Sequence, residues 1–423
     1  MSAINSSIEP GKSKNKGYSA FTALRYRDFR LLWLGQIVSV TGSQMQLAAV
    51  NWHVWLLTKS AFALGMVGFF RGAPIILCSL IGGVFADAVD RKRLMIVTQC
   101  VMLASAACLT FVTTAGLSHV WPIYLLTAIA SSASAFDTPA RQSLMPTLVP
   151  ARDFPNAVSL GVTVFHFAMI GGPSLAGFLL ASHGPAIVYA INAASYLSVI
   201  AALLAMRASG RAAVREGEAV SRVSFAALKE GLGFVRRTPI IVQTMTLDFA
   251  ATFFASATAL LPIFADKILN VGARGFGFLA AAPAVGAVIT GLVMARMGSF
   301  RRQGKLVIWS VAVFGLATIG FGVSRSFWLS LLMLGVAGAA DTVSTVLRQT
   351  IRQLATPDYL RGRMTSINMV FFMGGPQLGE VEAGAVAALV GAPLSVVTGG
   401  VGSVLCAVIA LLKARSLSSY DGG

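Results

Sequence analysis

The feature that most constrains this chain is a series of long apolar segments separated by short polar breaks. Segments of about 20 residues or more recur from Arg30 onward, and each is long enough to cross a bilayer as a helix. We place twelve of them, at 30–57, 62–86, 94–116, 121–140, 155–182, 185–206, 240–265, 276–297, 305–323, 327–347, 364–390 and 392–412. Only 12% of the 423 residues are charged, whereas a soluble surface usually needs about 25%. The sequence therefore predicts an all-α membrane protein.

The polar segments divide these twelve spans into two sets of six. Residues 207–239 form the longest polar segment after the N-terminal tail, and they carry seven of the basic residues. We therefore predict five parts: a tail at 1–29, a six-helix bundle at 30–206, a linker at 207–239, a second six-helix bundle at 240–412, and a tail at 413–423. An even number of spans places both termini on the same side of the membrane.

The net charge of +17 follows the same division. Of the 33 lysines and arginines, 28 lie in the tails, the linker and the loops on their side of the membrane, and four lie on the opposite side. This bias predicts that both termini are cytoplasmic, in a bacterial inner membrane. The basic residues are then expected to contact anionic lipid rather than nucleic acid. The first 29 residues lack the apolar segment of a secretory signal.

The two sets of spans also repeat each other in sequence. Asp137 and Arg141-Gln142 return as Asp341 and Arg348-Gln349, at offsets of 204 and 207 residues. Gly172-Pro173 returns as Gly375-Pro376, at an offset of 203. Internal repeats of this kind are typical of secondary transporters, whose substrate site lies between the repeats.

A cytoplasmic loop motif lies between the second and third spans, where residues 83–93 read Gly-Val-Phe-Ala-Asp-Ala-Val-Asp-Arg-Lys-Arg. It resembles the signature loop of the major facilitator superfamily, with Asp90 in place of the usual second glycine. The alternative is an ordinary basic loop. The resemblance implies a fold of two pseudo-symmetric six-helix bundles.

The same resemblance implies a cytoplasmic gate. Gly83 would allow close helix packing, and Asp87 would hold the start of span 11 near Arg363. Arg91, next to Lys92, would pair with Asp137, and both contacts would form in the outward-facing state and break when the protein opens inward. Asp341 would be the matching gate acid of the second half, where the loop motif itself is degenerate because Ala295 stands in place of the aspartate.

Two further motifs concern the direction of transport and the branch of the superfamily. Span 5 contains Gly171-Gly172-Pro173-Ser-Leu-Ala-Gly177, in which the proline is expected to kink the helix and the glycines to allow close packing. It resembles the motif of the superfamily's antiporters, which implies export. Segments 29–37 and 135–149 resemble the branch that includes enterobactin exporters and macrolide efflux proteins. Members of that branch are proton-coupled exporters of siderophores, macrolides and other amphiphiles.

Few ionisable residues remain inside the spans, and each is a candidate for proton coupling because charge in hydrocarbon is costly. They are Arg71, His166, Asp248, Glu380 and Glu382. Four of them have a structural alternative: an interhelical ion pair for Arg71, a helix-helix hydrogen bond for Asp248, a cavity hydrogen bond for His166, and contact with water for Glu382. We expect a buried carboxyl to take a proton outside and release it to the cytoplasm.

The superfamily lines its central cavity with spans 1, 4, 7 and 10. Gln36 and Gln44 in span 1, with Phe249 and Phe253 in span 7, then predict a mixed polar and aromatic surface suited to an amphiphile. The phenylalanines could equally face lipid.

No catalytic or metal-binding motif accompanies these features. The sequence lacks HExxH, CxxC and GxSxG, and the only GKS triplet lacks the rest of a phosphate-binding loop. The four cysteines lie within or at the ends of spans, so no disulfide framework is expected. We therefore predict a monomeric proton-driven exporter of a small amphiphile that has no enzymatic activity and no cofactor. The alternatives are an importer or facilitator of an organic solute, and a membrane sensor that shares the fold.

Overall fold

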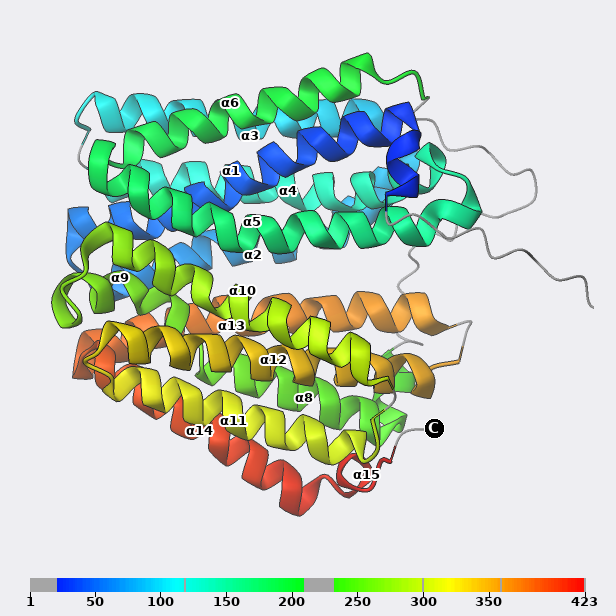
Figure 1. Cartoon of the computed structure of the whole chain (residues 1–423), viewed down its shortest axis with the longest axis vertical. Coiled ribbons are helices and arrows are strands. Elements are labelled where there is room, and N and C mark those ends of the chain that lie inside the picture. Colours follow the sequence, from blue (N-terminus) through cyan, green and yellow to red (C-terminus); the bar gives the residue numbers. More distant parts are fainter. Residues whose placement is uncertain (1–20, 118, 209–231, 299, 358–359, 422–423) are drawn as a thin grey trace, which may run out of the picture.

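Long helices account for nearly all of the computed structural model. It describes residues 21–117, 119–208, 232–298, 300–357 and 360–421. Within these ranges, the side chains of residues 79–88, 257, 361–363, 365–366, 369–370 and 372–373 lie outside the description. The helices form two groups, seen one above the other in Figure 1.

The N-terminal group contains six long helices. They are α1 (Arg27–Thr58), α2 (Ala61–Ala88), α3 (Arg91–Thr114), α4 (Val120–Leu148), α5 (Phe154–His183) and α6 (Pro185–Ala205). Short 3₁₀ turns, η1 (Thr22–Arg25) and η2 (Ala151–Asp153), precede α1 and α5. Asp90 caps α3 by accepting a hydrogen bond from the Arg93 amide, which gives this aspartate a structural role in the loop where the motif usually has glycine.

The C-terminal group repeats this arrangement with one interrupted member. Its helices are α8 (Pro239–Phe254), α10 (Gly272–Met297), α11 (Gln303–Val323), α12 (Phe327–Ala355), α13 (Arg361–Val390) and α14 (Ala392–Lys413). After Phe254 the chain continues through η3 (Ala257–Leu260), α9 (Leu261–Ile263) and the π-helical turn η4 (Phe264–Ile268). A short α15 (Arg415–Ser418) is the last helix of the described chain.

Twelve membrane-length helices are therefore present in the described ranges when α8 is counted with its continuation to Ile268. Nine of these segments are both long enough and apolar enough to cross a membrane by length and composition. The other three are α1, α4 and α13, which carry more polar residues. The predicted fold class, an all-α membrane protein with two six-helix bundles, is confirmed. The domain boundaries stay a prediction, because most of the linker lies outside the described residues.

Two helices continue beyond the ends predicted for their spans. Helix α4 continues to Leu148 and α12 to Ala355, eight residues beyond the predicted ends at 140 and 347. Both extensions are polar, so hydropathy alone could not detect them, and both contain arginines that reach other helices. The seventh span also differs from its prediction, since its α-helical geometry breaks at Ala255.

The two groups contact each other through α2 with α13 and through α5 with α10. Glycines make both contacts possible. A Cβ atom on Gly384 of α13 would lie 2.7 Å from the Cα of Gly65 on α2, and one on Gly277 of α10 would lie 2.9 Å from the Cα of Gly177 on α5. Any side chain at these positions would force the backbones apart.

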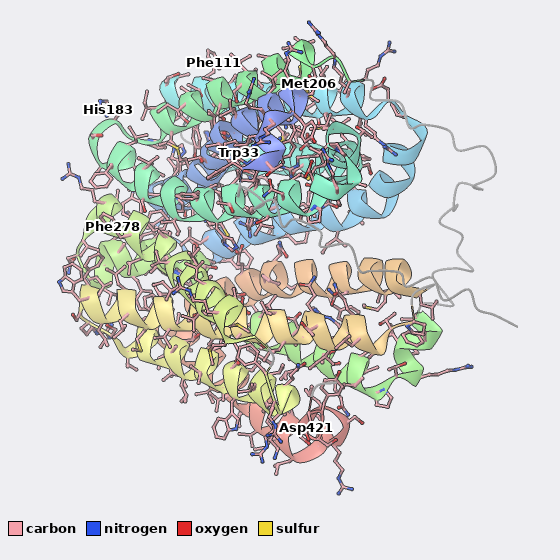
Figure 2. All side chains as sticks on the ribbon, turned by 45° about the vertical axis from the view of Figure 1, so that its right-hand side comes forward. Trp33, Phe111, His183, Met206, Phe278 and Asp421 are labelled. Carbon is pink, nitrogen blue, oxygen red and sulfur yellow. The ribbon has the colours of Figure 1, made fainter. Side chains whose placement is uncertain are left out.

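The first and last described segments, η1 and α15, lie at the same end of the helices (Figure 1). Figure 2 shows Asp421 beside α15 at the far edge of the C-terminal group, while Trp33 of α1 lies among the helices of the N-terminal group. Shared placement of the two ends agrees with the even number of spans.

Candidate functional site

A cavity of about 780 Å³ lies among the helices of the N-terminal group. All six helices of that group contribute to its lining, from Phe29 and Phe154 near the end that holds the termini to Val50 and Arg71 deeper in. The predicted substrate residues Gln36 and Gln44 both line it.

The predicted aromatic partners lie elsewhere. Phe249 and Phe253 on α8 stack on each other with ring centroids 6.0 Å apart, and Phe249 also meets Phe371 of α13 edge-on. Neither lines the cavity. Their contacts join α8 to α13 inside the C-terminal half, so nothing in this conformation places them next to a ligand in the cavity.

One wall of the cavity holds a connected set of neutral polar groups. The Asn192 amide donates to Gln46 over 2.7 Å and lies 3.3 Å from the Tyr196 hydroxyl, which in turn lies 3.2 Å from Ser43 Oγ. Because these groups satisfy one another, they fix α6 against α1. The cavity therefore has a rigid polar wall beside its apolar lining.

The cavity also contains charged residues on α4. Arg141 donates to the Gln36 side-chain oxygen. Asp137, one turn earlier, is buried and accepts from Gln99 Nε2 at 3.0 Å, and Thr98 Oγ1 lies at the same distance. Both neighbours of Asp137 are neutral.

A different cluster occupies the equivalent place in the C-terminal half. Arg348 of α12 pairs with Asp248 of α8 at 2.8 Å, and Arg352 lies 3.8 Å from the same carboxylate. Asp341, whose side chain is 46% exposed, lies 3.9 Å from Arg348. Asp248 and the two arginines are almost completely buried. The cluster thus holds α12 against α8 through buried charge.

Arg348 and Arg352 were not predicted as site residues. Span 10 was predicted to end at 347, which placed both arginines in a cytoplasmic loop, whereas α12 continues to Ala355. Their spacing carried a usable signal, since Asp341, Arg348 and Arg352 recur at helical intervals on one face.

An ion pair joins the two halves near the middle of the bundle. Arg71 Nη2 of α2 lies 3.0 Å from Glu380 Oε1 of α13, and both side chains are mostly buried. Gly68 lets the helices meet here, since a Cβ on it would lie 2.6 Å from the Cβ of Glu380. Arg71 also lines the cavity. The sequence named both residues as coupling candidates, and the tertiary structure makes them partners.

The remaining coupling candidates have fewer contacts. Glu382 is half-buried on α13. His166 is half-buried on α5, where its Nδ1 atom is buried without a hydrogen-bond partner and its ring meets Phe165 edge-on at 6.2 Å. His166 is not among the residues that line the cavity.

A second connection between the halves lies at the end opposite the termini. Asp266 accepts hydrogen bonds from Trp55 Nε1 and Lys59 Nζ, both over 2.9 Å, and Trp52 stacks on Phe276 with ring centroids 5.3 Å apart. No sequence pattern pointed to these residues, because the two partners are 207 or more positions apart. The end of the bundle away from the termini is therefore closed.

The predicted cytoplasmic gate is described only in part. The side chains of Gly83, Asp87 and Arg363 lie outside the described residues. Arg91 Nη1 donates to the Ser143 carbonyl oxygen at 2.9 Å, and Lys92 Nζ donates to that of Met206 at 2.8 Å. Arg91 does not contact Asp137 here. The predicted pair belongs to the outward-facing state, so this arrangement neither supports nor contradicts it.

The Gly-Pro motifs occupy the helices that join the halves. Pro173 lies inside α5 and Pro376 inside α13, and both helices continue beyond them. A Cβ on Gly172 would lie 2.6 Å from the Gln44 Cβ of α1, and one on Gly375 would lie 2.5 Å from Thr252 Oγ1 of α8. These glycines serve close helix packing, while a kink at each proline stays a prediction.

Two six-helix halves, glycine-mediated contacts between them, and a cavity beside a buried ion pair define a transporter of the major facilitator type. Comparison with known proteins agrees. Residues 18–421 match the family model described as transmembrane secretion effector, and the chain belongs to this family.

Its relatives include the enterobactin exporter EntS of Shigella boydii serotype 18 and that of Escherichia coli O81. Each is 24% identical over 394 residues, which cover 93% of this chain and 93% of the relative. The resemblance to this branch of the superfamily is therefore confirmed.

Solved structures share the fold at low sequence identity. A bacterial homologue of the iron transporter ferroportin, in an inward-facing state, has a TM-score of 0.67 at 16% identity, covering 93% of this chain and 99% of that one. A bacterial homologue of the human lysosomal transporter Spinster, inward-facing and unoccupied, has a TM-score of 0.71 at 15% identity, covering 94% and 99%. Both comparisons support the fold alone.

Proposed function

We propose that this protein exports a small amphiphilic molecule from the cytoplasm in exchange for protons, by alternate opening of the two ends of its helix bundle. The observation that carries this proposal is the Arg71–Glu380 ion pair, because it joins the two halves and lies beside the cavity. A carboxylate in that position links proton binding to the contact between the halves.

The coupling follows from charge. Ionised Glu380 attracts Arg71 and favours closure of the outer end. Protonated Glu380 is neutral, so this electrostatic attraction is lost. When the halves separate on the outer side, Glu380 meets outside water and takes a proton. When they close again, Arg71 returns and displaces that proton toward the cavity it lines. Closure and proton release are then one step.

Asp248 is the second coupling candidate, and its surroundings favour a different role. Two buried arginines face its carboxylate, so removing its charge would leave Arg352 without an anion and Arg348 with only the half-exposed Asp341 at 3.9 Å. We assign Asp248 to stabilising the α8–α12 contact and keep Glu380 as the proton carrier.

The cavity supports both the proposed direction of transport and an amphiphilic cargo. Its lining extends to Phe29 and Phe154, near the end that holds the termini, which the charge bias assigns to the cytoplasm. The lining mixes polar groups with apolar ones such as Trp33 and Met102. A protein that collects an amphiphile from the cytoplasmic side needs such a surface. The two relatives described above are both enterobactin exporters.

Transport by the purified protein in proteoliposomes tests the proposal. A fluorescent amphiphile is followed with and without a pH gradient, and exchange without a gradient is measured as counterflow. We expect movement of the amphiphile against the proton flux, and counterflow that persists without a gradient. Movement in the same direction as protons would indicate an importer, and absence of both activities would indicate a sensor.

A further inference from the structure

Asp137 is a buried carboxylate of the cavity without a cationic partner among the described residues. It is 5% exposed. Within the described part of the chain, no basic side chain forms an ion pair with it. Its two neighbours, Gln99 Nε2 and Thr98 Oγ1, both approach Oδ1. The Thr98 hydroxyl is also 2.9 Å from the Met95 carbonyl oxygen, so its single proton is shared. Among the described residues, no hydrogen-bond donor reaches Oδ2.

A second acceptor beside Asp137 also lacks a donor. Gln99 is 3% exposed and lines the same cavity, and its Oε1 atom is buried without a hydrogen-bond partner. Buried acceptors normally have a donor, because an unsatisfied one costs free energy. Ser134 lines the cavity one turn before Asp137 on α4. This corner therefore offers acceptors that a ligand with several N–H groups would satisfy.

Charge selects among such ligands. An isolated carboxylate in a membrane interior is costly, and a cationic donor removes that cost. The other charged residues of the cavity already have acceptors, since Arg141 donates to Gln36 and Arg71 pairs with Glu380. Arg141 thus has a neutral partner only, and Asp137 is the one anion among the described residues that line the cavity.

We propose that Asp137, Gln99 and Ser134 form a subsite for a protonated amino group, so that the cargo is an amphiphile with a basic amine. The apolar body of the molecule lies against the cavity's apolar lining, which includes Trp33, Met102 and Phe165. This inference rests on the proposed function for the export of that molecule. Binding at the subsite needs neither a gradient nor a direction of transport.

The test compares two probes that differ only in the amine. The purified full chain in phosphatidylcholine nanodiscs is titrated calorimetrically with naphthylethylamine and with naphthylethanol at neutral pH, and empty nanodiscs give the background. We expect the amine to bind about tenfold more tightly than the alcohol, the size of a charge-assisted hydrogen bond. Asp137→Asn should lower the amine's affinity to that of the alcohol and leave the alcohol unchanged, which also shows that the variant is folded. Gln99→Leu should weaken amine binding about threefold.

The matched control is Asp90→Asn, which removes the same charge from the same half. Asp90 caps α3 through its side chain and does not line the cavity, and asparagine caps equally well. Both affinities should stay as in the original protein. Equal binding of amine and alcohol, an amine preference that survives in Asp137→Asn, or no binding of either probe would each overturn the subsite. If the original protein bound the amine more tightly than the alcohol but showed no pH-driven efflux, the proposed function would be refuted and the subsite would stand.

Discussion

Arg71 of α2 and Glu380 of α13 lie 309 positions apart in the sequence and 3.0 Å apart in the structure. Their ion pair connects the two halves about ten residues, or roughly 15 Å, from the start of α2. It therefore lies at the depth where a transporter of this architecture alternates between its two openings.

Neutralising Glu380 tests this relationship. Glu380→Gln should abolish pH-driven efflux, because glutamine carries no ionisable proton, while counterflow persists. Proteoliposome flux with and without a pH gradient measures both. Glu382→Gln, two residues further along the same helix, should keep most of the gradient-driven flux. If the two variants exchanged these outcomes, Glu382 would be the proton carrier.

The outer contact between Lys59 and Asp266 should bias the protein toward closure of that end. Both side chains are partly exposed, so we expect Asp266→Asn to cost about 1 kcal/mol or less and to shift the population by up to about fivefold toward outer opening. Spin labels on Leu117 and Arg325, two exposed positions on different halves, report the separation in a background without the four native cysteines. An unchanged distance distribution would remove Asp266 from the closure.

The buried cluster of the C-terminal half should contribute to stability. Asp248→Ala leaves buried Arg352 without an anion and buried Arg348 with only the distant, half-exposed Asp341, and we expect a loss of about 3–5 kcal/mol in the free energy of unfolding. Asp341→Ala is the matched comparison, since that carboxylate is half-exposed and 3.9 Å from Arg348, and should cost about 1 kcal/mol or less. Denaturant unfolding in detergent ranks the two. Equal losses of unfolding free energy in the two variants would show that burial of the Asp248–Arg348 pair does not determine its contribution to stability.

Glycine at the interface between the halves should be essential to the closed outer end. Gly384→Val places a side chain against the α2 backbone, where a Cβ would lie 2.7 Å from the Gly65 Cα, so we expect the outer end to open. Gly171→Val is the control, because a Cβ there meets no atom within 4 Å. The same pair of spin labels distinguishes them. A closed distance in Gly384→Val would show that the helices can separate locally without opening the bundle.

Much of the architecture could be predicted from local sequence patterns. Span length, the polar linker and the repeated Gly-Pro pair predicted the fold and its two similar halves, because hydrophobic length and sequence repeats can be read along the chain without knowing how distant helices pack. Prediction failed where a helix continues on polar residues. The final turns of α12 are hydrophilic, and their arginines are buried only because α8 supplies Asp248. Prediction also failed for Phe249 and Phe253. They were expected to line the cavity, but their rings pack against each other and against α13.

The sequence by itself determined that this chain is a twelve-span membrane protein with repeated halves, and which few ionisable residues remain inside it. Apolar length and the distribution of basic residues are properties of the chain, and the bilayer responds to them segment by segment. Only the tertiary structure decided which of those residues meet. Arg71 pairs with Glu380, Asp248 pairs with two arginines, and Asp137 has only neutral hydrogen-bond partners among the described residues. Pairing depends on how distant helices pack, and a one-dimensional pattern does not contain that information.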